Sequence, residues 1–272
     1  MFGTNPFAPA MQSLPAGFME WYLCLMVAAV IVGVLVDVTH KGSAKYFFEN
    51  MRRAKGRGRE VGGGEKLSIA AQTLVVDVLA SGEFCNAKRR VAHLLGMYGF
   101  ILYVVATAVL VCAYPASASA GIWPVLWWIG ALMIVVGGYW FWFFIRVDVA
   151  AEGHTPFRVV RADLFILSLL ASTTLGILWA ATGGGTGVLF WLYLLATAVL
   201  FLGVPWSKFA HMFFKPAAAF EKRLSRADGT AENLPLQSRD DPEQQKKHSM
   251  ELLQNAPMDM GLGIKREAPR HY

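Results

Sequence analysis

Residues 91–113 read VAHLLGMYGFILYVVATAVLVCA, a run without a charged side chain that directly follows Lys88, Arg89 and Arg90. A helix crosses the roughly 30 Å hydrocarbon core of a membrane with about 20 apolar residues, so this run is long enough to span it. The cations before the run mark the end of the helix that faces water. The stretch therefore predicts a membrane-spanning helix whose first turn lies at the membrane surface.

Four further windows of the same kind predict an all-α integral membrane protein with a bundle of five transmembrane helices. They cover residues 18–38, 123–147, 163–182 and 188–213. The composition agrees, since 55% of the residues are hydrophobic and only 16% are charged.

The chain divides into three parts by composition. We expect an N-terminal segment 1–17 outside the membrane and a five-helix membrane domain over 18–215 that includes the long loop 39–90. Residues 216–272 are rich in charged residues, Gln and Pro, and they predict a largely disordered tail.

The basic residues decide the orientation of the predicted bundle. All 25 Lys and Arg residues fall in the loop 39–90, in the turn 146–162 or after residue 207. By the positive-inside rule these segments are cytoplasmic, so the N-terminus lies outside and the C-terminus inside. A bacterial inner membrane is the expected location. Contact with anionic lipid explains the net charge of +6, and no nucleic-acid partner is needed.

Cysteine spacing offers no metal or cluster site. Cys24, Cys85 and Cys112 lack the paired spacing of a zinc site, an iron–sulfur cluster or a covalent haem attachment. The candidate metal ligands are therefore histidines.

Two of the six histidines, His93 and His211, are placed to act together. Each follows a cation by three residues, Arg90 and Lys208 respectively, near the cytoplasmic end of a predicted span. Two imidazoles at matched depth on different helices can hold a b-type haem between them. A structural histidine pair is the alternative.

The neighbours of these histidines permit the same two interpretations. Gly96 and Gly99 leave room for a flat macrocycle beside the helix, or they serve close helix packing. Arg89, Arg90 and Lys208 lie where haem propionates would point, or they are ordinary cations at the membrane surface.

Two motifs resemble a known family. KRRVAHLLGMYGF at 88–100 and VPWSKFAHMFFKP at 204–216 are similar to the paired signature of the nitrate-reductase gamma-subunit-like cytochrome b family. They also resemble the membrane part of quinone-interacting oxidoreductase complexes of sulfur metabolism and the small membrane anchor of adenylylsulfate reductase. The resemblance covers about residues 18–220.

This resemblance implies an electron-transfer subunit without catalytic residues of its own. In such proteins a five-helix bundle holds b haems and passes electrons between quinone and a cytoplasmic iron–sulfur flavoenzyme, here expected to be adenylylsulfate reductase. His93 and His211 would bind one haem b at the inner face. At the outer positions this chain has Tyr103 and Tyr193, which predict aromatic filling in place of a second haem.

Other functions remain open from the residues alone. A cofactor-free membrane tether for a cytoplasmic enzyme is the main alternative, and a small-solute transporter is disfavoured because no internal repeat is visible. Asp37, Asp163 and Trp206 are candidate quinone neighbours, although each also fits a capping or interface role.

The loop 39–90 contains one periodic stretch. Its apolar residues recur at helical spacing and predict a short helix that either rests on the membrane or docks a partner. They are Leu67, Ala71, Leu74, Val75 and Val78.

Overall fold

The computed structural model describes residues 2–40, 45, 49, 51–52, 58–82, 84, 86–146, 149, 153–207 and 211–230, without the side chains of residues 211 and 214. Over these ranges the chain is helical and forms no β-strand, apart from an isolated bridge between Thr4 and Ser119. The predicted all-α class is confirmed.

Four helices in the described part of the chain are long and apolar enough to cross a membrane. They match the first four predicted windows within a few residues, which identifies a helical membrane protein. The helices are α2 (Phe18–Thr39), α5 (Ala87–Cys112), α6 (Trp123–Trp140), which continues as the π-helix η2 (Phe141–Ile145), and α8 (Leu164–Ala181), which follows the 3-10 helix η3 (Arg161–Asp163).

The fifth apolar helix is shorter than predicted. The sequence predicts one span over 188–213, but α9 (Val188–Leu202) has only 15 residues. A short 3-10 helix, η4 (Val204–Trp206), follows, and α10 (His211–Ala227) is a separate helix. The predicted continuation of this helix to residue 213 was wrong because Pro205 lacks the N–H that would continue the α9 hydrogen-bond ladder, and its ring clashes with the preceding turn.

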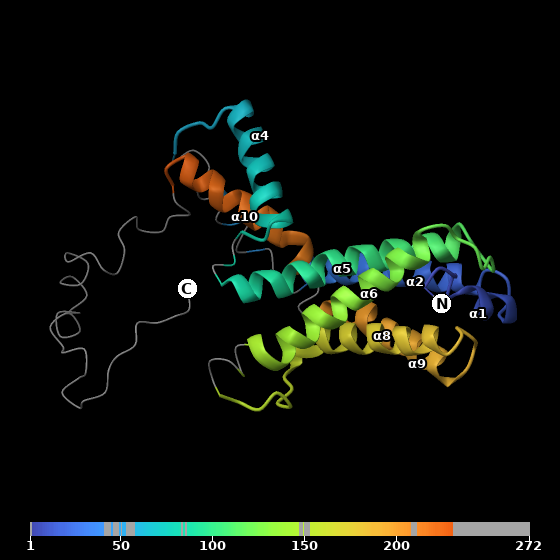
Figure 1. Cartoon of the computed structure of the whole chain (residues 1–272). Helices are drawn as coiled ribbons and strands as arrows, with labels where there is room; N and C mark the ends of the chain where they lie inside the picture. The colour runs from blue at the N-terminus through green and yellow to red at the C-terminus, as the bar shows by residue number, and fades with distance from the viewer. Residues whose placement is uncertain are drawn as a thin grey trace, which may run out of the picture.

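The five apolar helices run side by side (Figure 1). Glycines allow α5 and α6 to approach closely: a Cβ on Gly130 would lie only 2.6 Å from the backbone nitrogen of Tyr103. Small residues at such contacts are typical of helix packing in membranes, where lipid supplies no hydrophobic drive for association.

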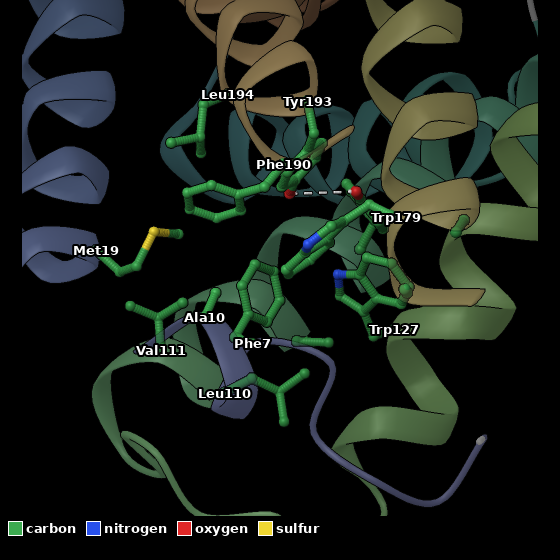
Figure 2. Packing of buried hydrophobic residues seen from close by; sticks show 14 of the residues in the cluster. Phe7, Ala10, Met19, Leu110, Val111, Trp127, Trp179, Phe190, Tyr193 and Leu194 are labelled. Atoms are coloured by element: carbon green, nitrogen blue, oxygen red, sulfur yellow. Dashed lines mark hydrogen bonds between the residues drawn. The ribbon is translucent and has the colours of Figure 1, made fainter. Parts of the chain in front are cut away.

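The N-terminal segment folds into one end of the bundle, although the sequence suggested only an external segment. Asn5 donates hydrogen bonds from Nδ2 to the carbonyls of Leu110 (3.3 Å) and Tyr114 (3.0 Å). Phe7 precedes α1 (Ala8–Ser13) and is completely buried among aromatic rings (Figure 2), with ring centroids 5.2 Å from Trp179 and 6.0 Å from Trp127. The segment therefore closes this end of the core.

A two-helix lobe lies at the opposite end, beside the start of α5 (Figure 1). It consists of α4 (Gly63–Gln72), which continues as the π-helix η1 (Thr73–Leu79), and of α10. The helix predicted within the loop 39–90 is thus confirmed.

The folded region extends beyond the predicted start of the tail at residue 216, because α10 runs to Ala227. The Arg223 guanidinium binds both carboxylate oxygens of Asp77 on η1, at 2.6 and 2.9 Å. The rest of the predicted tail, from residue 231, lies outside the described residues.

Candidate functional site

His93 lies in the second turn of α5, at the end of the bundle that carries the lobe. Asn86 begins this helix, since its side-chain oxygen accepts the N–H groups of Lys88 and Arg89 at 3.0 and 3.2 Å. The exposed His93 ring points to the segment after η1: its Nδ1 is 3.0 Å from the Ser81 hydroxyl, and its centroid is 4.8 Å from the Phe84 ring. Ser81 is buried, and its hydroxyl is the hydrogen-bond partner of this ring nitrogen.

Arg89 and Arg90, predicted as propionate partners, both bind backbone carbonyls. Arg89 Nη2 donates to Ile145 at 3.2 Å, and Arg90 Nε donates to Ala80 at 2.8 Å. These bonds attach the start of α5 to the ends of η2 and η1. A guanidinium has five N–H donors, so one such bond does not exhaust its capacity to bind an anion. Lys208 lies outside the described residues.

His211 is the first residue of α10, and not the inner end of the last span as predicted. Its side chain is not among those described. The start of α10 nevertheless lies near His93, because Lys215 Nζ is 5.3 Å from the centroid of the Phe84 ring, which also contacts His93. His211 precedes Lys215 by four residues, about one helical turn. The two histidine-bearing segments therefore meet around Phe84.

The two glycines after His93 have different surroundings. A Cβ on Gly96 would meet no atom within 4 Å, so there is open space beside the helix at this level. A Cβ on Gly99 would lie 2.8 Å from the Cβ of Met133. Gly99 thus serves helix packing, while a side chain at Gly96 would face open space.

The two positions predicted to hold aromatic filling in place of an outer haem contain a buried tyrosine pair. The Tyr103 hydroxyl donates to the Tyr193 hydroxyl at 3.3 Å. Trp179 stacks on Tyr193 with ring centroids 5.4 Å apart, and the Trp127 ring is 5.1 Å from Tyr103. The predicted aromatic packing at these two positions is confirmed.

Among the described side chains of the inner site, only His93 could serve as an axial ligand of a haem. His93 supplies an imidazole, Ser81 binds its Nδ1 as an outer partner of a ligating histidine does, and Gly96 provides space. Among the side chains described, no group of three or more His, Cys, Asp or Glu gathers as a metal-ion site.

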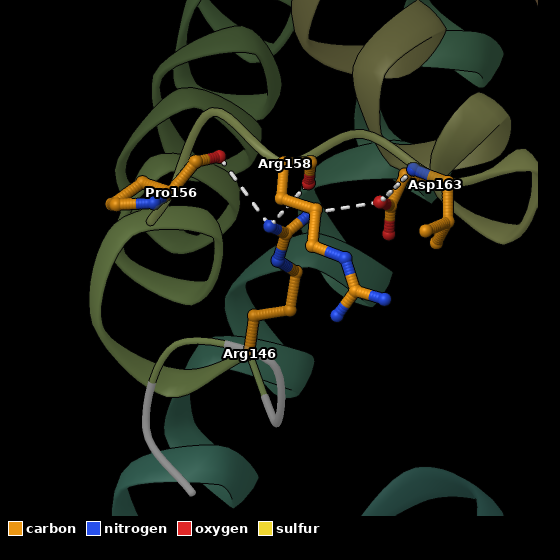
Figure 3. Close-up of polar contacts among 5 residues, drawn as sticks. Arg146, Pro156, Arg158 and Asp163 are labelled. Atoms are coloured by element: carbon orange, nitrogen blue, oxygen red, sulfur yellow. Dashed lines mark hydrogen bonds and ion pairs between the residues drawn. The ribbon is translucent and has the colours of Figure 1, made fainter. Parts of the chain in front are cut away.

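A buried ion pair joins the ends of two apolar helices at the lobe end of the bundle (Figure 3). Arg146 Nη1 donates to Asp163 Oδ2 at 2.7 Å, and its Nη2 donates to the carbonyl of Arg158 at 2.7 Å. Asp163 Oδ2 also accepts the Val160 N–H at 3.0 Å. Asp163 is therefore a structural residue of this turn. The sequence contained an indication of this pair, because Arg146 lies near the end of one apolar window and Asp163 at the start of the next.

The other two candidate quinone neighbours differ in exposure. Asp37 is buried near the end of α2, and Trp206 is exposed in η4.

The fold and site define a helical membrane protein with a histidine at one end of its bundle and a closed aromatic core at the other. The chain matches no family model, no curated protein and no solved structure.

Proposed function

We propose that this protein anchors a cytoplasmic iron–sulfur flavoenzyme to a bacterial inner membrane and relays electrons between that enzyme and quinone. A single haem b, held by His93 and His211, would serve as the one-electron carrier. Adenylylsulfate reductase is the partner that the two sequence motifs favour.

The contact of Phe84 with both histidine-bearing segments carries the proposal. The break after α9 removes His211 from the last span, and this alone would argue against a shared site. Phe84, however, packs on His93 and lies beneath Lys215, one turn from His211. The beginning of α10 therefore lies near the start of α5, where His93 is.

A fifth crossing at α9 is part of the proposal. Its 15 residues extend about 22 Å, and the three residues of η4 add about 6 Å. The sum approaches the roughly 30 Å of a hydrocarbon core. An odd number of crossings would place the N-terminal segment outside and the lobe in the cytoplasm.

The chain's own residues would hold and tune the site. Ser81 fixes the His93 ring through Nδ1, so Nε2 is the atom that would bind iron. The Phe84 ring shields one side of the imidazole from water. Lys215, with Arg89 and Arg90, would offset the negative charge of propionates at the membrane surface.

A reduced-minus-oxidised absorption spectrum of the purified protein tests the haem. We expect a b-type band that His93→Ala and His211→Ala each abolish. His154→Ala is the control, because His154 lies in an exposed loop at the lobe end of the bundle, and it should leave the band unchanged. Wild-type protein without a band would exclude the electron relay.

A cofactor-free tether is the second candidate, since the Ser81 and Phe84 contacts also suit a histidine that only packs. Electron exchange with captured adenylylsulfate reductase separates the two functions. In the relay, His93→Ala still captures the enzyme but stops electron exchange between the enzyme and a quinone analogue. In the tether, wild-type protein captures the enzyme and supports no exchange.

A further inference from the structure

The continuous helix formed by α4 and η1 has one face covered by α10. Ile69 and Thr73 are buried on this face, and Asp77, one turn further, binds Arg223 of α10. The spacing of four residues places these side chains along one side of the helix. The opposite side has no described helix against it.

That opposite side is apolar. Leu67 is 73% exposed, Leu74 is 55% exposed and Val75 is 56% exposed. These residues and Ala71 lie on one stripe at helical spacing, roughly opposite Thr73. An apolar stripe on a helix whose other side is already covered by α10 is typical of a helix lying in a membrane interface.

Two hydrogen bonds fix the depth of the C-terminal end of η1. Tyr98 Oη donates to the Leu79 carbonyl at 2.8 Å, and Arg90 Nε donates to the Ala80 carbonyl at 2.8 Å. Both donors are on α5, where Arg90 is the last cation before the apolar run and Tyr98 lies about 12 Å further along the helix. Leu79 and Ala80 therefore lie at the boundary between the polar and apolar parts of α5.

From this boundary the helix runs across the direction of the spans (Figure 1). A helix that starts at the membrane boundary and runs across the spans lies along the membrane surface. Exposed cations, Lys66 on α4 and Lys88 at the start of α5, suit the anionic headgroups found there.

We infer that α4 and η1 form an interfacial helix in the lipid leaflet on the basic side of the protein. Leu67, Ala71, Leu74 and Val75 enter the boundary between headgroups and acyl chains, and α10 lies on the opposite side of the helix. The helix holds Ser81, and through it His93, at a constant depth. This inference rests on the membrane assignment of the proposed function and does not require a haem.

Spin-label accessibility tests the inference on the full chain. Cys24, Cys85 and Cys112 are replaced by Ser, and a nitroxide is attached at Leu67→Cys or at Ser68→Cys. Ser68 is the matched control, since it is adjacent but lines the groove between α4 and α10. Collision rates with oxygen and with a water-soluble nickel chelate are measured in vesicles of phosphatidylethanolamine and phosphatidylglycerol.

We expect the oxygen-to-nickel ratio to be several-fold higher at Leu67 than at Ser68. Equal ratios at the two positions would overturn the inference. A Leu67 label that neither reagent reaches and that shows spin–spin broadening would also overturn it, because a second copy of the protein would then cover the stripe. A label at Ile31→Cys, on the exposed side of α2, must be oxygen-accessible. If it is not, the membrane assignment itself fails.

Discussion

The hydroxyls of Tyr103 and Tyr193 meet at 3.3 Å in the buried core, linking α5 and α9 across the bundle. Gly176 on α8 faces this contact, because a Cβ there would lie 2.6 Å from the Tyr103 oxygen. Three helices thus meet at this polar contact inside the apolar core.

Removing either hydroxyl should weaken the bundle by a small, measurable amount. Hydrogen bonds between membrane helices contribute about 0.6 kcal/mol on average. We expect Tyr103→Phe and Tyr193→Phe each to lower the free energy of unfolding by about this much, and the double variant to lose little more than either single one. Equilibrium unfolding in mixed micelles measures these losses of free energy. Fully additive losses in the double variant would contradict a direct hydrogen bond.

Gly176→Ala should destabilise the protein by overpacking. The added methyl group would clash with the Tyr103 oxygen, and overpacking costs about 1–3 kcal/mol. The loss should shrink in a Tyr103→Phe background, where the clashing oxygen is absent. Gly96→Ala is the control, because a Cβ added there would meet no atom within 4 Å and alanine favours the helix. An equal loss at both glycines would indicate a backbone effect.

Hydropathy predicted the long helices well, because a window of about 20 apolar residues depends on composition alone. It failed after Leu202, where apolar residues continue but Pro205 interrupts the backbone ladder. The packing of Phe7 into the core also escaped prediction, since it depends on rings from α6, α8 and α9 that are distant in sequence.

The sequence pointed to the histidines of the candidate site and the cations and glycines beside them, but not to the side chains that contact His93. His93 stands out as a polar residue inside an apolar run. Its neighbours Ser81 and Phe84 precede it by 12 and 9 residues, and they reach it only because the chain turns back after η1. A positive φ of 50° at Ser81, unusual for a residue other than glycine, marks this turn and has no signal in the sequence.

The Arg146–Asp163 pair should be the most sensitive polar contact of the described bundle. Both side chains are largely buried, and removing one partner of a buried ion pair leaves an uncompensated charge that costs about 3–5 kcal/mol. We expect Asp163→Asn and Arg146→Met each to destabilise the protein strongly.

A double-mutant cycle isolates the interaction between Arg146 and Asp163. Combining both changes should cost far less than the sum of the single losses. Arg158→Ala is the control, because Arg158 binds Arg146 through its backbone carbonyl, which alanine keeps. Additive losses in denaturant unfolding would show that the two charges act independently.

The attachment of α10 to η1 should depend on pH through Asp77. The Arg223 guanidinium beside it lowers the pKa of the Asp77 carboxyl below its ordinary value, as a hydrogen-bonded cation favours the charged form. A carboxyl whose pKa is lowered in the folded state stabilises the folded protein at pH values above its unfolded pKa, which is about 3.9 for Asp. This stabilisation is lost as the pH falls through the folded-state pKa.

We therefore expect α10 to stay attached from pH 7 to pH 5 and to loosen below about pH 4. Amide hydrogen exchange across residues 211–227, corrected for the intrinsic pH dependence of exchange, reports the change. Asp77→Asn should raise exchange at pH 7 by about fivefold, corresponding to about 1 kcal/mol for a partly exposed pair, and should abolish the acid-induced step. Arg226→Gln, on the same helix but outside the pair, should keep the wild-type profile. An acid-induced step that persists in Asp77→Asn would assign the pH dependence to another carboxylate.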